Sequence, residues 1–257
     1  MYKISDTTDF SPPLIFTCGQ CFRFDEVSDG VWRGAAFGRV LTVSAAAIDC
    51  TAGDYENVWR VFFDMDTDYA AIRKAVSINA FMSEAAEFGR GIRILRQDFW
   101  ETLCSFIISQ QNNIPRIKGI IRRLCAAYGN PLEDGYSAFP TAEALAALDE
   151  GALRELGLGY RAPYVLSAAR AFARGGVDRE NLTALHGVGA KVANCVMLYG
   201  LHRMDVFPVD TWMRRGMGKY FPKNFDPREF GAYAGAAQQY IFHYVRYLHG
   251  KTGVTNA

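Results

Sequence analysis

The spacing of apolar and polar residues divides the chain near residue 90. Before that point, short apolar stretches are separated by Gly, Asp and Ser, and they predict strands over residues 16–24, 31–34 and 40–43. A helical pattern follows over residues 69–88. We therefore expect residues 1–90 to form a small α+β domain with an antiparallel sheet.

Helical periodicity dominates from Ile92 onward, and residues 91–257 are expected to form a mostly α-helical domain. The clearest helix enters through Asn113 and Pro115, residue types that favour a helix start. Its apolar face comprises Ile114, Ile117, Ile120, Ile121, Leu124, Cys125 and Tyr128. Asp226 and Pro227 predict the start of a last helix that runs towards Leu248. The fold class is α+β.

A glycine-rich turn precedes Lys191. Gly187 and Gly189 lie between a short helical run, about 179–184, and an apolar helix, about 190–199, and both are expected to allow positive φ. Such a turn directs backbone N–H groups towards the second helix's start, where the helix dipole also favours an anion. The pattern indicates a helix-hairpin-helix element at about 179–200 that holds a DNA phosphate; an ordinary αα corner would use the same residues.

Lys191 and Asp210 are the candidate catalytic pair. Lys191 falls in the first turn of its helix, where the dipole disfavours a cation, and burial beneath bound DNA would further favour the neutral amine that a nucleophile needs. Asp210 precedes a new helix and is predicted to be its N-cap. A carboxylate held ionised near an amine also suits stabilisation of a cationic sugar as a glycosidic bond breaks.

The distribution of charged and apolar residues bears on what the protein binds and where it is found. The net charge is only +1, but two stretches without acidic residues, 102–132 and 211–225, carry Arg and Lys and predict local basic faces. Arg122 and Arg123 could equally be the solvated side of a helix. No segment has the length of a membrane span, and the N-terminus has no signal or transit pattern, so we expect a cytoplasmic protein.

Cysteine spacing predicts no metal centre. The six cysteines are expected to be reduced in an intracellular protein. Cys18 and Cys21 have metal-like spacing, but no second pair or paired histidines completes a zinc site. No cysteine follows Cys195, so a C-terminal iron–sulfur loop cannot form.

Four segments together resemble a known family. They are CGQCFRF at 18–24, RQDFWETLCSFIISQQNNIPRI at 96–117, LGLGYRAPYV at 156–165, and LHGVGAKVANC at 185–195 followed by VFPVDTWMRR at 206–215. The chain is similar, over about residues 16–246, to the 8-oxoguanine DNA glycosylases of the helix-hairpin-helix DNA glycosylase superfamily. Bifunctional members carry a lysine at the position of Lys191. The resemblance implies a bacterial-type glycosylase with AP lyase activity and duplex DNA containing 8-oxoguanine as its partner.

The resemblance also implies a base pocket. The carbonyl of Gly19 would accept a hydrogen bond from N7–H of 8-oxoguanine and repel the N7 lone pair of guanine. Phe242 would stack on one face of the flipped base, with the Cys195 side supplying the other. Gln238 would bind the Watson–Crick edge. Without the family, Gly19 would be interpreted as a strand bulge and Phe242 as a core residue.

The family also implies the DNA contacts. Tyr160 would insert into the duplex as a wedge, and Arg161 and Arg116 would bind the unpaired cytosine. The other residues expected at the DNA are Gln111, Asn112, Gly187, Gly189 and Trp212. Two residues depart from the eukaryotic pattern: Gln111 replaces an asparagine, and Trp212 replaces a histidine near the phosphate. The longer Gln111 side chain leaves strict selection of cytosine open. The Trp212 indole N–H can still donate one bond.

Two other functions remain open from the sequence. A monofunctional glycosylase for adenine or alkylated purines would share the fold and Asp210 without needing Lys191. A non-catalytic DNA-binding protein would need only the hairpin. We expect a monomer without a cofactor, apart from a cation that family members bind through hairpin backbone carbonyls.

Overall fold

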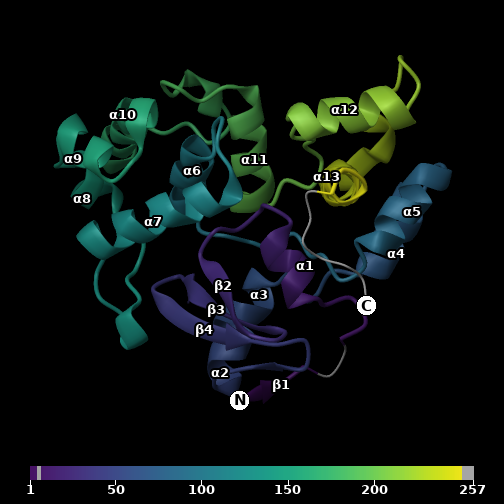
Figure 1. The fold of residues 1–257 in the computed structure, drawn as a ribbon, viewed down its shortest axis with the longest axis horizontal. Helices are drawn as coiled ribbons and strands as arrows, with labels where there is room; N and C mark the ends of the chain where they lie inside the picture. Colours follow the sequence, from purple (N-terminus) through teal and green to yellow (C-terminus); the bar gives the residue numbers. More distant parts are fainter. Residues whose placement is uncertain (5–6, 251–257) are drawn as a thin grey trace.

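The N-terminal part of the protein is built on an antiparallel sheet (Figure 1). The computed structural model describes residues 1–4 and 7–250. The five strands run in the order β1-β5-β4-β3-β2, and each neighbouring pair is antiparallel. They are β1 (Tyr2–Lys3), β2 (Phe24–Ser28), β3 (Val31–Ala36), β4 (Arg39–Val43) and β5 (Ala47–Ile48). The predicted antiparallel sheet is confirmed, with β3 and β4 at the positions expected.

The strand predicted over residues 16–24 is wrong. This stretch begins at the end of helix α1 (Pro12–Thr17), and β2 starts only at Phe24. Two prolines occupy the first turn of α1, where a missing N–H costs nothing. The apolar run that follows them is too short for periodicity to separate a helix from a strand. Residues 18–23 therefore form a loop that connects α1 to β2.

The helix predicted over residues 69–88 is broken into two. The elements here are α2 (Ala52–Asp54), a π-helical turn (Tyr55–Trp59), α3 (Arg60–Phe62), α4 (Tyr69–Val76) and α5 (Ala80–Phe88). The backbone N–H of Met82 donates to Asn79 Oδ1 at 2.9 Å, so Asn79 caps α5 and begins a new helix. A polar capping residue inside an apolar pattern was the missed signal.

Eight helices make up the rest of the described chain. They are α6 (Phe99–Ile108), α7 (Ile114–Tyr128), α8 (Ala142–Ala146), α9 (Glu150–Glu155), α10 (Ala162–Ala173), α11 (Ala190–Gly200), α12 (Thr211–Tyr220) and α13 (Ala234–Leu248). Short 3-10 turns lie at Glu133–Gly135, Gly159–Arg161, Leu182–Ala184 and Pro227–Tyr233. The mostly helical second part is confirmed. Among the residues described, no helix is long and apolar enough to cross a membrane.

Individual helix predictions had mixed outcomes. Helix α7 starts where predicted, with Asn113 as its cap, and its apolar face is buried. The short run at 179–184 is reduced to the single turn at Leu182–Ala184. The last helix is interrupted, because Gly231 has a φ of 57° and separates the Pro227–Tyr233 turn from α13.

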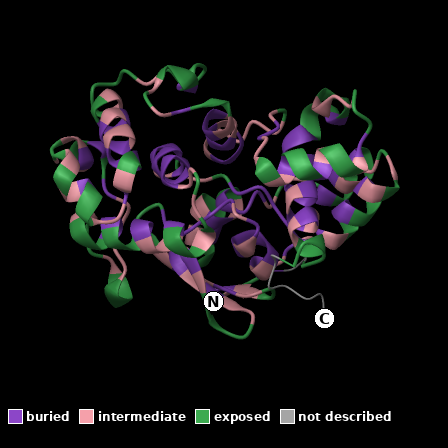
Figure 2. Ribbon diagram, turned by 45° about the horizontal axis from the view of Figure 1, so that its top comes forward, coloured by how far each residue is buried: buried purple, intermediate pink, exposed green. Residues whose placement is uncertain are grey.

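Three hydrophobic clusters hold these layers together. One joins α6, α7, α10 and α11; a second joins α4 and α5 to α12 and α13; the third lies between the sheet and α1. Buried residues gather where the helices face one another (Figure 2). The second cluster draws on both sides of the predicted boundary near residue 90, so α4 and α5 pack with the C-terminal helix. The two helical clusters flank a cleft.

Candidate active site

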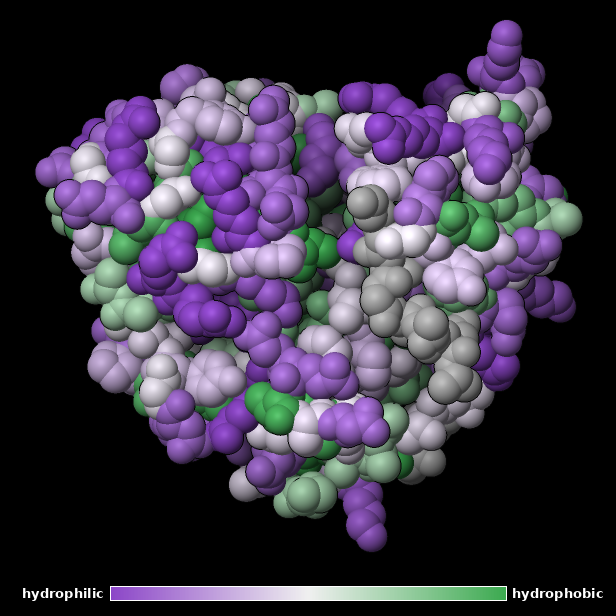
Figure 3. All heavy atoms as spheres, viewed as in Figure 1, coloured by the Kyte–Doolittle hydropathy of each residue, from purple (hydrophilic) through white to green (hydrophobic). Residues whose placement is uncertain are grey.

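The cleft between the helical clusters holds the residues singled out from the sequence. Figure 3 shows a hollow between the two lobes on this face of the molecule. It corresponds to a cavity of about 320 Å³ lined by Lys191, Asp210, Gly19, Phe242 and Trp212 among others. A smaller recess of about 40 Å³ adjoins it and adds Cys195 and Gln238. Residues from three distant parts of the chain therefore meet at one place.

The hairpin before Lys191 uses its two glycines differently. Gly187 has a φ of 81°, and a Cβ there would overlap the ring of Tyr164. Gly189 is the N-cap of α11 in an extended conformation, with φ −89° and ψ 176°. Of the two glycines, only Gly187 therefore uses the positive φ that both allow, and one left-handed residue completes the turn. A Cβ at Gly189 would meet no atom within 4 Å.

Lys191 extends from the first turn of α11 into the cavity. Its Nζ lies 5.1 Å from the centroid of the Phe106 ring, and Phe106 is itself buried on α6. An ammonium over an aromatic face is held by the ring quadrupole. Burial raises the pKa of the Cys195 thiol, and the neighbouring Lys191 opposes that rise. Cys195 is thus a neutral thiol one helical turn beyond the amine.

Asp210 is the N-cap of α12, as predicted. Its Oδ1 accepts a hydrogen bond of 2.8 Å from the backbone N–H of Met213. This bond orients the carboxylate at the edge of the cavity that Lys191 also lines. A cap that is half-buried beside an amine can both start a helix and face a substrate.

The recess beside Gly19 contains a buried polar side chain, that of Gln238. The Oε1 of Gln238 is buried and has no hydrogen-bond partner among the described residues. A buried amide oxygen without a donor is costly unless a ligand supplies one. Gly19 has a φ of 83°, and a Cβ on it would lie 3.4 Å from the Phe242 ring. The predicted base-binding residues Gly19, Cys195, Gln238 and Phe242 all line this recess.

The predicted wedge lies outside the cavity at a second loop. Tyr160 is 43% exposed, and its hydroxyl donates to the carbonyl of Gln110 at 3.1 Å. Arg161 is only 3% exposed, and its guanidinium lies over the Tyr160 ring and donates to the carbonyls of Gln110 and Gln111. In the free protein Arg161 therefore braces the α6–α7 loop, where Gln111 has a φ of 46°.

The remaining predicted DNA contacts lie around the cleft. Arg116 is exposed at the start of α7, and Asn112 donates its side-chain amide to the carbonyl of Ile108 at 3.2 Å. Trp212 lines the cavity, with the guanidinium of Arg215 over its ring at 5.3 Å. The DNA roles of Arg116, Asn112 and Trp212 stay predictions.

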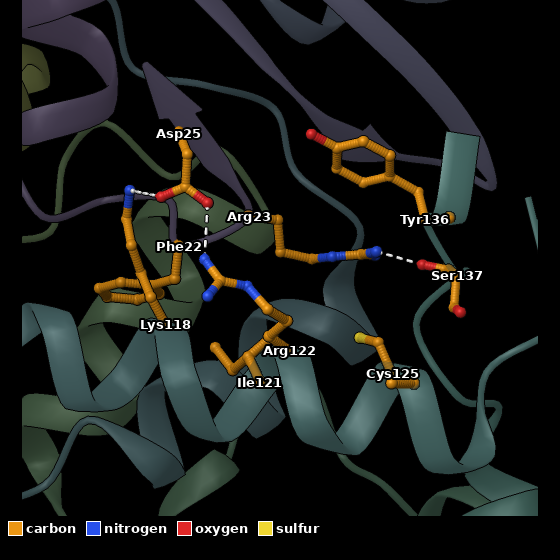
Figure 4. Close-up of a pocket in the computed structure, with 11 residues that line it drawn as sticks. Phe22, Arg23, Asp25, Lys118, Ile121, Arg122, Cys125, Tyr136 and Ser137 are labelled. Carbon is orange, nitrogen blue, oxygen red and sulfur yellow. Dashed lines mark hydrogen bonds and ion pairs between the residues drawn. The ribbon is translucent and has the colours of Figure 1, made fainter. Parts of the chain in front are cut away.

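A second cavity lies on the sheet side of α7, outside the cleft (Figure 4). Its basic residues are already paired: Lys118 Nζ lies 3.0 Å from an oxygen of Asp25, and Arg122 lies 2.9 Å from the other. Arg23 contacts Glu101 at 3.3 Å. The basic face predicted over residues 102–132 is therefore partly neutralised by Asp25, a residue far away in the sequence.

The cysteines near the cleft are buried thiols. No cluster of three or more His, Cys, Asp or Glu suited to a metal occurs in the parts of the chain that the structure describes. Burial raises the pKa of Cys18 to about 12 and that of Cys21 to about 11. Both are therefore neutral thiols, because burial disfavours the thiolate.

Sequence reasoning missed several residues that shape the cleft. Phe106, Tyr199 and Gln239 line the recess or the cavity, yet in the sequence they are ordinary positions within helices. Their roles come from contacts between helices that lie far apart in the chain. The one available signal was the adjacency of Gln239 to Gln238 within an otherwise apolar helical face.

Known protein families match most of this chain. Residues 3–103 match the model of the 8-oxoguanine DNA glycosylase N-terminal domain, and residues 104–229 match that of the HhH-GPD superfamily of base excision DNA repair proteins. A structure of MBOgg1 in complex with a low-affinity DNA ligand has a TM-score of 0.88 and 38% identity, over 94% of each chain.

Two further relatives carry descriptive names. The Clostridium acetobutylicum 8-oxoguanine glycosylase/lyase, in complex with double-stranded DNA containing cytosine opposite 8-oxoG, has a TM-score of 0.87 and 34% identity over 94% of this chain and 93% of that one. The N-glycosylase/DNA lyase of Saccharomyces cerevisiae is 38% identical over 60% of this chain, a match that spans only 48% of the yeast protein. The chain belongs to the 8-oxoguanine DNA glycosylases of the HhH-GPD superfamily.

Proposed function

We propose that this chain removes 8-oxoguanine from duplex DNA, with Lys191 as the nucleophile and Asp210 as the stabilising carboxylate, and then cleaves the strand as an AP lyase. The observation that carries this proposal is the meeting of the Lys191 amine, the Asp210 carboxylate and the polar recess around Gln238 in one cleft. The family to which the chain belongs supports the same activity.

The base must leave the helix before it can enter the recess. The recess continues into the larger cavity, and Phe242, which is only partly buried, lines both, so the flipped base would stack on this ring. The unpartnered Oε1 of Gln238 would then accept from the donors on the Watson–Crick edge of guanine. Gly19 would distinguish the oxidised base at N7.

The chemistry follows from the residues in the cavity. The neutral amine of Lys191 attacks C1′, the bond from C1′ to N9 breaks, and the base leaves with that electron pair and takes up a proton. One amine proton moves to the ring oxygen as the sugar opens to a Schiff base. Loss of a C2′ proton then expels the 3′ phosphate by β-elimination. Asp210 stabilises the positive charge that develops on the sugar.

The duplex side of the proposal rests on the loop at Tyr160. Its exposed ring would fill the gap left by the flipped nucleotide. Arg161 and Arg116 would bind the unpaired cytosine with their planar donor groups, which requires Arg161 to release the carbonyls of Gln110 and Gln111. Gln111 and Asn112 would contact the DNA beside them, and the hairpin at Gly187 and Gly189 would bind the backbone.

The wider setting is also proposed. The protein would act as a monomer on bacterial nucleoid DNA in the cytoplasm, with a domain boundary near residue 90 and a cation on the hairpin carbonyls. The Clostridium relative was crystallised with cytosine opposite the lesion, and we propose the same opposite base for this chain.

An excision panel tests the function directly. Duplexes with 8-oxoguanine opposite each of the four bases, and duplexes with adenine or 3-methyladenine as the target, are incubated with the protein, and base release and strand cleavage are measured separately. We expect release of 8-oxoguanine, fastest opposite cytosine, followed by cleavage 3′ to the lesion. Release of adenine or 3-methyladenine without 8-oxoguanine would favour a monofunctional glycosylase, and binding without release would favour a non-catalytic protein.

A further inference from the structure

The backbone on either side of Gly19 is fixed by glutamine side chains from distant elements. Gln239 on α13 donates from Nε2 to the carbonyl of Cys18 at 2.7 Å. Gln97 donates from Nε2 to the carbonyl of Gln20 at 2.8 Å. The carbonyls before and after that of Gly19 are therefore both occupied. Gly19 itself lines the recess.

Gln239 is oriented by a second partner. Its Oε1 accepts a short hydrogen bond from the hydroxyl of Tyr199 on α11. Because the Cys18 carbonyl can only accept, the amide nitrogen must face Cys18 and the amide oxygen must face Tyr199. Gln239 and Tyr199 are 1% and 3% exposed, so water cannot readily replace either bond.

Tyr199 connects this arrangement to the lysine. Its ring stacks on that of Phe106, with centroids 5.4 Å apart and an interplanar angle of 15°. The Nζ of Lys191 also lies over the Phe106 ring, 5.1 Å from its centroid. The series Lys191, Phe106, Tyr199, Gln239 and Cys18 thus runs across the floor of the cleft from the amine to the segment that carries Gly19.

We propose that Gln239, held by Tyr199, is a positioning residue that aims the Gly19 carbonyl and thereby sets the discrimination between 8-oxoguanine and guanine. This inference rests on the proposed function of the same site. Glycine has no Cβ to restrict its rotation, so the peptide plane after it stays in place only if its neighbours are fixed. Fixing the Cys18 carbonyl with Gln239 provides that restraint.

Discrimination depends on the aim of one oxygen. At N7, 8-oxoguanine offers a hydrogen and guanine offers a lone pair, so a well-directed carbonyl attracts the first and repels the second. Both effects weaken as the hydrogen-bond angle departs from linear. Loss of the restraint should therefore weaken binding of the lesion and relieve the repulsion of guanine, which lowers the selectivity ratio from both sides.

The test measures that ratio in a background that cannot react. Lys191→Gln protein is compared with the double variants that add Gln239→Met or Tyr199→Phe, and Kd is measured for duplexes containing 8-oxoguanine, guanine or 7-deazaguanine opposite cytosine. Methionine keeps the length of Gln239 without its hydrogen bonds. We expect Gln239→Met to lower the ratio for 8-oxoguanine over guanine by about tenfold, and Tyr199→Phe by less.

The 7-deazaguanine duplex isolates N7, because this base has a C–H group in place of the lone pair. The Lys191→Gln protein should bind it better than guanine, and Gln239→Met should reduce that difference. Trp100→Phe is the control: its buried indole N–H donates to the carbonyl of Pro140 at 2.9 Å, and Trp100 lines neither the cavity nor the recess. It should lower the Tm without changing the ratio.

The outcomes separate the inference from the function on which it rests. If the Lys191→Gln protein prefers 8-oxoguanine and Gln239→Met lowers both affinities equally, Gln239 is merely structural and the inference is wrong. A misfolded variant is recognised by loss of its thermal transition, and Tyr199→Phe, which keeps the aromatic stack, then decides. If Lys191→Gln protein shows no preference for 8-oxoguanine, the proposed function itself fails.

Discussion

Two walls of the cleft are built in different ways. The catalytic wall, made of Lys191 and Asp210, consists of two helix starts: Lys191 follows a glycine turn, and Asp210 forms an N-cap bond with Met213. The recognition wall, made of residues 18–20 with Gln238 and Phe242, is held by side chains more than seventy residues away.

This difference separates reactivity from selectivity. A change in the catalytic wall should affect every substrate, because it alters the groups that act on the sugar. A change in the recognition wall should affect substrates according to the base they carry. The first two predictions below test the catalytic wall, and the others test how the hairpin and the helix behind the recognition wall are stabilised.

Removal of the amine should have the largest effect. Lys191→Gln should abolish base release from 8-oxoguanine duplexes and strand cleavage of both 8-oxoguanine and abasic duplexes, because it removes the proposed nucleophile. Single-turnover assays measure both steps. Lys118→Gln is the matched control, since Lys118 is paired with Asp25 outside the cleft. Equal losses in the two variants would contradict the assignment of Lys191.

Asp210→Asn should reduce catalysis while the helix cap survives. Asparagine is as good an N-cap as aspartate, so the bond to Met213 can remain. Loss of the negative charge should slow base release by about 10²- to 10³-fold. A fall in Tm of several degrees together with a small kinetic effect would mean that Asp210 is only a cap.

The two hairpin glycines should differ in stability. Gly187→Ala places a Cβ in the ring of Tyr164 at a positive φ, at a cost of about 3 kcal/mol in the free energy of unfolding. Gly189→Ala has open space and an ordinary φ, so it should cost less than about 1 kcal/mol. Urea unfolding measures both. Similar costs would mean that the hairpin differs from this geometry.

His243 should give the recognition wall a modest sensitivity to acid. Burial, aided by the positive charge of Arg246, lowers its pKa from 6.5 to about 4. The unfolded chain therefore binds the proton first, and stability should fall by about 2–3 kcal/mol as the pH drops from 6.5 to 4.

His243→Phe provides the check on that slope. Neither ring nitrogen of His243 has a hydrogen-bond partner among the residues described, so phenylalanine loses no bond. The ring should still pack against Phe88 on α5. The difference in unfolding free energy between the variant and the parent should therefore grow as the pH falls through this window. A constant difference would show that His243 does not titrate there.

The contrast between the walls also explains what could be predicted from the sequence. The cap at Asp210, the entry of α7 at Asn113 and the start of α11 depend on a few adjacent residues, and each was predicted correctly. The strand expected over residues 16–24 failed because a short apolar run fits two conformations. Asn79 was overlooked as a cap within an apolar pattern.

Residues that act through long-range contacts had little sequence signal. Gln239 reaches its hydrogen-bond partners only because α13 packs against α11 and the segment after α1. The contact between the Phe106 ring and the Lys191 amine likewise depends on the packing of α6 against α11. Arg122 was as consistent with a DNA face as with a solvated helix, and its ion pair with Asp25 depends on the position of β2. The roles of the base and DNA contacts came from family resemblance.

The most direct test of the central claim is to identify the atom that becomes attached to DNA. The protein is mixed with a duplex containing 8-oxoguanine, reduced with borohydride and digested, and the modified peptide is sequenced by mass spectrometry. The account predicts one adduct, a deoxyribose remnant on the ε-nitrogen of Lys191. An adduct on another lysine or on the N-terminal amine, or base release without any adduct, would contradict it.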